Sequence, residues 1–153
     1  MGNYILIFIF TFMKITILNG PNLNHIGQRE PEIYGIENFD SLLQRLEKDF
    51  PILKIKLKQT NCEGELIDYL QEANQEAEAV ILNAGAYTHT SIAIADAVRC
   101  MQIPVVEVHI SNVYARESYR QHSYLSPHVL GTIGGFGMQS YSLAVQALIQ
   151  YQK

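Results

Sequence analysis

The chain has 153 residues, of which 48% are hydrophobic and 17% charged, enough for one compact domain but not for two. Its formal net charge of -4 argues against a protein that binds nucleic acid or an anionic membrane through a basic surface, so we expect a small-molecule ligand. Cys62 and Cys100 have neither CxxC nor zinc-ligand spacing, which predicts two buried, reduced thiols in a cytoplasmic protein.

Residues 4–12 (YILIFIFTF) are almost wholly apolar, but they fall far short of the roughly 20 residues that a membrane helix needs. No basic residue precedes the run and no small-residue cleavage site follows it, so a signal peptide is not favoured either. We hypothesise that Met13 opens the functional chain. Residues 1–12 are then an extension outside the core, and 13–153 form a single catalytic α/β domain. A native terminus that precedes Met13, found by mass spectrometry, would refute this hypothesis.

From residue 14 onward, short β-rich runs alternate with amphipathic stretches, which is typical of a doubly wound α/β sheet. The expected elements are, in chain order, a strand at 14–19, a helix at 37–50, a strand at 52–58, a helix around 66–70, a strand at 79–83, a helix at about 91–101, a strand at 105–109, a strand near 129–133 and a helix at about 139–151. This order predicts a flavodoxin-like fold with a five-stranded parallel sheet of order 2-1-3-4-5.

Two segments of this pattern carry extra information. The strand at 52–58 alternates apolar residues with Lys54, Lys56 and Lys58, which predicts a half-exposed strand at the edge of the sheet. The connection at 20–35 is rich in glycine, proline, asparagine and charge, and it is long for a loop between a strand and a helix. Such a length favours a lid over an active site.

Amides, hydroxyls and imidazoles gather where three of the expected strands end. The stretches are NGPNLN at 19–24, NAGAYTH at 83–89 and EVHISN at 107–112. In a sheet of this order, ligands bind beyond the carboxyl ends of the strands, near the switch in strand order. A single asparagine or serine here is more often an ordinary turn or cap residue. The convergence of three strand ends indicates a ligand site.

Glu107 and His109 are two residues apart on one expected strand, so their side chains leave the same face. A carboxylate so placed can orient and charge an imidazole, which makes His109 a candidate general acid. A histidine at a strand end is otherwise more often solvated or simply packed. His89 lies at the same rim, whereas His25, His122 and His128 have no comparable support.

The expected lid places Arg29 five residues before Tyr34. Tyrosine titrates near ~10, so about 0.1% is phenolate at pH 7, and a tyrosine base needs a nearby cation such as this guanidinium. Taken alone, the pair is a weak signal and is more typical of a solvated surface loop. Further on, Arg116 and Arg120 would project together if their segment forms a helical turn, as a receptor for a carboxylate and hydroxyls or as a solvated charged face.

Four ordered motifs combine these residues: NGPNLNHIGQREPEIYG at 19–35, NAGAYTHTS at 83–91, EVHISNVYARESYR at 107–120 and HSYLSP at 122–127. Together they resemble type II 3-dehydroquinate dehydratase. The resemblance implies a flavodoxin-like subunit in a homododecamer of four trimers. It also implies anti elimination of water from 3-dehydroquinate through an enolate, with no cofactor and no metal, in the shikimate pathway or in quinate breakdown.

The resemblance also assigns roles. Tyr34, activated by Arg29, is the base that removes the proton next to the ketone. Asn22 holds a water or the oxyanion, and His109, backed by Glu107, protonates the departing hydroxyl. The remaining matches are contacts rather than chemistry: Asn83, His89 and Arg120 to substrate hydroxyls, the amides of Ile110 and Ser111 to the carboxylate, Arg116 at the rim, and Asp96 toward the site of a neighbouring subunit.

Two alternatives from other classes share the expected sheet. A flavodoxin-like carrier of FMN would need a phosphate cradle rich in serine and threonine after the first strand, where this chain has GPNLN. A receiver-type signalling domain would need clustered acids there, and residues 19–24 contain none. A colourless pure protein would dispose of the FMN carrier.

Overall fold

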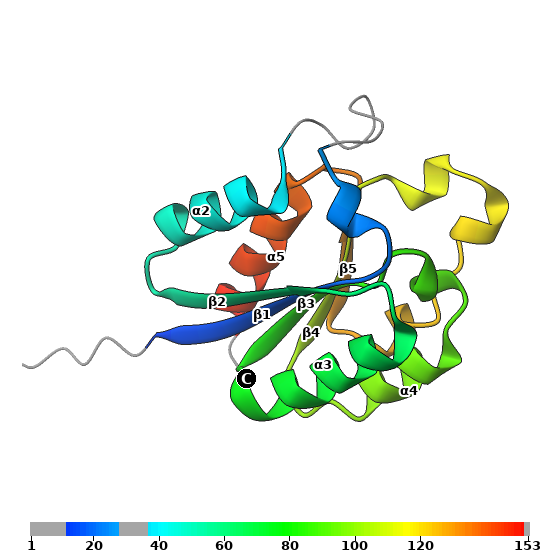
Figure 1. Cartoon of the computed structure of the whole chain (residues 1–153), viewed down its shortest axis with the longest axis horizontal. Helices are drawn as coiled ribbons and strands as arrows, with labels where there is room; N and C mark the ends of the chain where they lie inside the picture. The colour runs from blue at the N-terminus through cyan, green and yellow to red at the C-terminus, as the bar shows by residue number, and fades with distance from the viewer. Residues whose placement is uncertain (1–11, 28–36, 152–153) are drawn as a thin grey trace, which may run out of the picture.

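The computed structural model describes residues 12–27 and 37–151, which form an α/β fold around one five-stranded sheet (Figure 1). The strands are β1 Met13–Asn19, β2 Leu53–Gln59, β3 Ala79–Asn83, β4 Val105–His109 and β5 Gly131–Gly134. All neighbouring strands pair in parallel, in the order β2-β1-β3-β4-β5. The predicted flavodoxin-like topology is confirmed.

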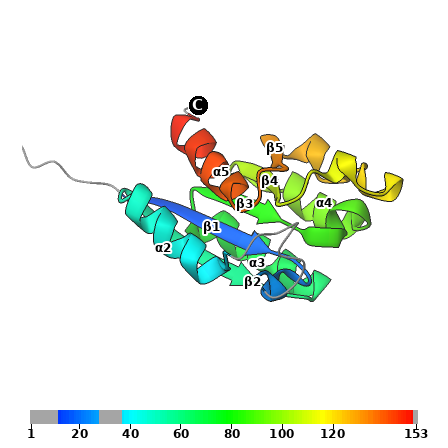
Figure 2. The same cartoon turned by 90° about the horizontal axis from the view of Figure 1, so that it is seen from above.

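The α-helices of the described residues cover both faces of the sheet. They are α2 Phe39–Asp49, α3 Glu63–Glu76, α4 Ile92–Arg99 and α5 Gln139–Gln150. Helices α2 and α5 lie on one face and α3 and α4 on the other, and Figure 2 views the sheet from the side of α2 and α5. Short 3₁₀ helices complete the connections: η1 Leu23–His25, η2 Gly85–His89, η3 Val113–Ala115, η4 Ser118–Arg120 and η5 Ser126–His128.

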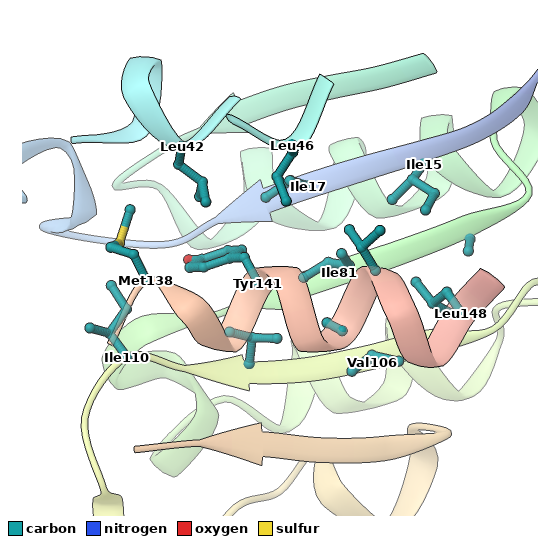
Figure 3. Packing of buried hydrophobic residues seen from close by; sticks show 14 of the residues in the cluster. Ile15, Ile17, Leu42, Leu46, Ile81, Val106, Ile110, Met138, Tyr141 and Leu148 are labelled. Atoms are coloured by element: carbon teal, nitrogen blue, oxygen red, sulfur yellow. The ribbon is translucent and has the colours of Figure 1, made fainter. Parts of the chain in front are cut away.

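Alternation along the central strands divides the core into two layers. Ile15 and Ile17 of β1 face α2 and α5, where they pack with buried leucines such as Leu46 (Figure 3). Leu18 faces the opposite way and packs against α3 and α4, in contact with a cluster that includes Leu70. Each such side chain contributes about 1.5–3 kcal/mol when it is fully buried. Both layers therefore anchor β1, the strand that leads into the 20–24 stretch.

The start of α2 has a local cause. Asn38 accepts a hydrogen bond from the backbone N–H of Ser41 at 2.9 Å, and the Ser41 hydroxyl accepts one from the backbone N–H of Asn38 at 3.2 Å. This reciprocal cap satisfies two backbone donors that a helix leaves unpaired. The predicted helix at 37–50 is thus confirmed, with its first turn fixed by Asn38.

Strand β2 is at the edge of the sheet, as its alternating pattern predicts. Its apolar residues pack against the layer of α2 and α5. On the other face, Lys56 lies 2.7 Å from Glu72 and 3.1 Å from Glu76 of α3, and Lys58 also pairs with Glu72. Hydrogen bonds from Lys56 and then Lys58 lower the pKa of Glu72 to about 2. Lys56 and Lys58 are therefore paired with a helix rather than left bare.

The last strand begins two residues later than expected, at Gly131 rather than near Val129. Its pairing with β4 opens where the backbone N–H of Leu130 donates to the carbonyl of Val105 at 2.7 Å. Val129 instead follows η5 and packs against the layer of α3 and α4. The predicted start of the strand was too early because the residues before the glycines are β-prone.

The expectation of two buried thiols is wrong. Cys62 and Cys100 are both free and exposed, at the start of α3 and the end of α4. Cap positions lie at the ends of elements, where a small side chain reaches solvent whatever its polarity. Among the helices of residues 12–27 and 37–151, none is long and apolar enough to span a membrane.

Candidate active site

A cavity of about 320 Å³ opens where β1, β3 and β4 end. It is lined by Pro21, Asn22, Leu23, His25, Ile26, Asn83, Gly85, Ala86, His89, His109, Ile110, Ser111, Val113, Arg116 and Arg120. The predicted site residues among them are Asn22, Asn83, His89, His109, Ile110, Ser111, Arg116 and Arg120. The fold thus brings together residues from three separate stretches of sequence, at the edge where they were expected.

The other predicted site residues lie elsewhere. Glu107 is fully buried and bonded to His109, which stands between it and the cavity. Asp96 is on α4 outside the cavity lining, with its carboxylate 3.7 Å from the guanidinium of Arg99. Arg29 and Tyr34 fall outside the described residues, so their roles stay predictions.

The loop after β1 reaches the cavity because Gly20 passes against the end of β3. Its backbone N–H donates to the carbonyl of Asn83 at 2.7 Å, and a Cβ on Gly20 would lie 2.4 Å from the carbonyl oxygen of Ala84. Two residues later, Asn22 takes a left-handed conformation with φ 67°, which asparagine tolerates better than most residues. Its backbone N–H donates to Oδ1 of Asn61 at 2.9 Å. This hydrogen bond of its own backbone therefore holds Asn22 at the cavity wall.

At the end of β4, His109 and Glu107 form a buried pair. His109 Nε2 lies 2.9 Å from Glu107 Oε1, and Glu107 has no exposed surface. Their same-face placement, predicted from the two-residue spacing, is confirmed by this contact. The carboxylate fixes the ring and supplies the counter-charge that an imidazolium needs in a buried position. This is the geometry of a supported proton donor.

Hydroxyl groups surround the rest of the Glu107 carboxylate. Thr88 donates to Oε1, Ser123 lies 2.9 and 3.0 Å from the two oxygens, and Thr132 lies 3.3 Å from Oε2. Burial alone would raise the pKa of Glu107, but the hydrogen bonds from His109, Thr88 and Ser123 outweigh it and hold the pKa below its usual range. The group is thus kept as a carboxylate.

His89 stands beside His109, with ring planes 15° apart and centroids separated by 6.2 Å. Its Nδ1 is 2.7 Å from the backbone carbonyl of His122. A carbonyl only accepts, so Nδ1 carries the proton and Nε2 is an acceptor in the neutral ring. Burial lowers the pKa of His89, and the nearby charges of His109 and Arg120 add to this effect. His89 and His109 therefore differ in character, since of these two His109 is the one that contacts a carboxylate among the described residues.

The two arginines of the rim come from successive 3₁₀ turns rather than from one helical turn. Arg116 directly follows η3 and Arg120 ends η4. Glu117 forms ion pairs with both arginines: its Oε2 lies 3.0 Å from Nε of Arg120 and 3.7 Å from Nε of Arg116. Arg116 also donates to the hydroxyl of Ser111 at 3.3 Å. Both guanidiniums belong to residues of the cavity lining, and such groups suit the binding of an anion.

The site therefore combines a rim that carries two arginines with a buried pair of a histidine and a carboxylate at its floor. No group of three or more His, Cys, Asp or Glu side chains among residues 12–27 and 37–151 is placed to hold a metal ion. Comparison with known proteins identifies the family. The family model described as dehydroquinase class II matches residues 13–149. The chain belongs to the class II dehydroquinase family.

Relatives and solved structures of this family agree over nearly the whole chain. The 3-dehydroquinate dehydratase of Exiguobacterium sp. is 53% identical over 140 residues, which are 91% of this chain and 96% of the relative. That of Acaryochloris marina is 51% identical over 140 residues, 90% and 94% of the two chains. The crystal structure of the type II dehydroquinase from Butyrivibrio crossotus superposes with a TM-score of 0.86 at 40% identity, covering 91% of this chain and 99% of the other.

Three residues around the site of this class II dehydroquinase were missed by the sequence analysis. Thr88 and Ser123, which bind Glu107, lie within quoted motifs, so the motifs themselves were the available signal. Tyr141 of α5 is the third, and it joins the end residues of β1 and β3 from beneath the cavity. A tyrosine among apolar helix residues looks like an ordinary core residue, so no pattern in the sequence indicated its role.

Proposed function

We propose that the chain is a type II 3-dehydroquinate dehydratase, which converts 3-dehydroquinate to 3-dehydroshikimate by anti elimination of water through an enolate. The observation that carries the proposal is the buried pair of Glu107 and His109 at the floor of a cavity with a cationic rim. The substrate is a carboxylate with several hydroxyls, which suits such a cavity. Membership of the class II dehydroquinase family and the names of the relatives support the same reaction.

Elimination beside a ketone needs a base, a group that stabilises enolate charge and an acid for the leaving hydroxyl. His109, oriented by Glu107, is the proposed acid. Asn22, fixed at the cavity wall by its backbone, holds a water or the enolate oxygen. Tyr34, ionised beside Arg29, is the proposed base, and this part of the proposal rests on the motif resemblance.

Substrate recognition is proposed to use the rest of the cavity lining. The contacts to the substrate hydroxyls come from Asn83, His89 and Arg120. The backbone N–H groups of Ile110 and Ser111, which follow β4, hold the carboxylate. Arg116 supports this corner through its 3.3 Å hydrogen bond to the Ser111 hydroxyl. A cation beside two backbone donors favours a bound anion.

We also propose a cytoplasmic homododecamer of four trimers that serves the shikimate pathway. The family resemblance supports this assembly, in which Asp96 reaches the site of a neighbouring subunit. Asp96 lies on α4 outside its own cavity, with 64% of its side chain exposed, as such a role requires. Sedimentation analysis tests the assembly, and a monomer at micromolar concentration would contradict it.

The test of the reaction is to add 3-dehydroquinate to the pure protein and follow the ultraviolet absorbance of the conjugated enone product. We expect turnover with no cofactor or metal added. The Tyr34→Phe variant should lose nearly all of it, because phenylalanine has no oxygen to ionise. The matched control is Tyr69→Phe on α3, where the lost hydroxyl contacts only Glu65 in the described structure.

Two outcomes would contradict the proposal at different levels. A fully active Tyr34→Phe variant would reject the tyrosinate base while leaving the overall reaction intact. Absence of turnover in the unsubstituted protein would reject the reaction itself. Borohydride added with the substrate should not inactivate the enzyme, since no lysine lines the cavity among the described residues.

A further inference from the structure

Beneath the cavity, three buried side chains form a hydrogen-bonded chain from β1 to β3. Nδ2 of Asn83 donates to the Tyr141 hydroxyl at 2.9 Å, and that hydroxyl donates to Oδ1 of Asn19 at 2.8 Å. Tyr141 has no exposed surface. Its ring lies between α5 and the sheet, with the oxygen pointing toward the carboxyl ends of the strands (Figure 3). These two hydrogen bonds therefore connect the protein core directly to Asn83, which lines the cavity.

The direction of these hydrogen bonds is set by the backbone. The N–H of Gly85 lies 3.2 Å from Oδ1 of Asn83, and because a backbone N–H can only donate, the Asn83 oxygen must face it. The amide nitrogen of Asn83 then faces Tyr141 and can only donate. The phenol has a single proton, which goes to Asn19. Among the contacts of residues 12–27 and 37–151, the second N–H of the Asn83 amide has no partner, so it can serve a ligand.

Asn19 adds a second observation. Its Nδ2 is buried and has no hydrogen-bond partner among the described residues. Such groups are rare in folded proteins because they lose their hydrogen bonds to water without replacement. An apolar side chain would serve packing better at this position. What the asparagine supplies here is its oxygen, the acceptor that takes the proton of Tyr141.

We propose that Tyr141 is a positioning residue for substrate binding, which holds Asn83 as a hydrogen-bond donor toward the cavity. The inference rests on the proposed function, in which Asn83 binds a substrate hydroxyl. It adds that this hydroxyl is recognised through its oxygen as an acceptor. Without the phenol oxygen, the Asn83 amide keeps, among the described residues, only its contact to Gly85 and can rotate away from the productive orientation.

The expected effect separates binding from chemistry. Contacts made equally in the ground state and the transition state change KM rather than kcat. Tyr141→Phe should therefore raise KM about tenfold, the loss of roughly one hydrogen bond, while kcat changes less than about threefold. The matched control is Val145→Ala on the same helix, a buried position outside the hydrogen-bonded chain. It should lower the melting temperature and leave KM unchanged.

A double-mutant cycle tests whether Tyr141 acts through Asn83. Tyr141→Phe should add little to the KM of Asn83→Ala, because the amide that it positions is already absent. Additive effects on KM would overturn the inference, as would an unchanged KM in a folded Tyr141→Phe variant of an active enzyme. Should Tyr141→Phe fail to fold, Asn19→Ala replaces it. That variant leaves the phenol proton free to turn toward Asn83, so KM should rise, and an unchanged KM would overturn the inference.

The outcome also separates this inference from the proposed function. If the unsubstituted protein turns over 3-dehydroquinate and Tyr141→Phe behaves like Val145→Ala, only the positioning role is wrong. If the unsubstituted protein shows no turnover, the proposed function falls and the inference falls with it.

Discussion

Replacing Glu107 with glutamine removes a buried charge while keeping the shape of the side chain. His109 Nε2 lies 2.9 Å from the carboxylate, a distance at which full opposite charges attract by about 6 kcal/mol with an effective dielectric constant of about 20. Desolvation of the charges and the hydrogen bond that the amide oxygen still accepts reduce the net loss to about 2–3 kcal/mol. We therefore expect kcat to fall about 30- to 150-fold.

The assay is steady-state turnover of 3-dehydroquinate across pH, with kcat and KM determined separately. Besides the lower kcat, the alkaline limb of the kcat profile of Glu107→Gln should move to lower pH, because the imidazolium of His109 has lost its counter-charge. KM should change little, since Glu107 does not line the cavity. A purely structural defect would lower activity without moving that limb.

The matched control is Glu65→Gln on α3. Glu65 also binds two hydroxyls, those of Thr60 and Tyr69, but it is remote from the cavity lining. Its substitution should leave kcat and the pH profile as they are. If folded Glu107→Gln kept full kcat and an unmoved alkaline limb, the assignment of His109 as an acid supported by Glu107 would be refuted.

Three further predictions concern Glu107, Gly20 and Arg120. The pKa of Glu107 is lowered from 4.5 in the folded state, so its ionisation stabilises the protein above about pH 4.5, and that stability is lost as pH falls through the lower folded value. Between about pH 6 and pH 3, the free energy of unfolding measured in urea should therefore fall less for Glu107→Gln than for the unsubstituted protein. Gly20→Ala should lower kcat/KM at least about tenfold, because the added Cβ would lie 2.4 Å from the backbone of Ala84. Its control is Gly64→Ala in α3, where the added Cβ meets open space, and this change should stabilise the protein by about 0.5–1 kcal/mol in thermal unfolding. Arg120→Ala should raise KM about tenfold or more in the turnover assay, because a guanidinium of the cavity lining is lost, and an unchanged KM would remove Arg120 from substrate binding.

Much of the fold was predictable because buried strands and turn residues leave strong local signals. The strands at 79–83 and 105–109 were predicted with their observed bounds, since each is a short apolar run that ends at polar residues. The strand at Gly131–Gly134 was placed too early because glycine has no side chain to reveal a strand, while Val129 and Leu130 have high β-propensity. Burial of Cys62 and Cys100 was predicted wrongly, because exposure at a helix end depends on where the chain turns.

The place of the site follows from the strand order, but of the contacts within it only those with local geometry were predictable. The contact of Glu107 with His109 follows from the period of a strand, in which alternate residues share a face. The hydrogen bonds from Ser123 to Glu107 and from Tyr141 to Asn19 span 16 and 122 residues of sequence. They arise from how a loop and a helix pack onto the sheet, and no local pattern encodes such packing.

In the proposed reaction, the hydroxyl groups around Glu107 matter most when His109 has given up its proton. An isolated carboxylate in this buried place would then favour the neutral acid, because burial disfavours its charge. The hydroxyls of Thr88 and Ser123 remain as donors whether or not the imidazole is charged, so Glu107 stays ionised through the cycle. The proposed cycle can therefore restore the imidazolium of His109 beside a bound anion, because the negative charge of Glu107 behind it is already stabilised by groups that do not titrate.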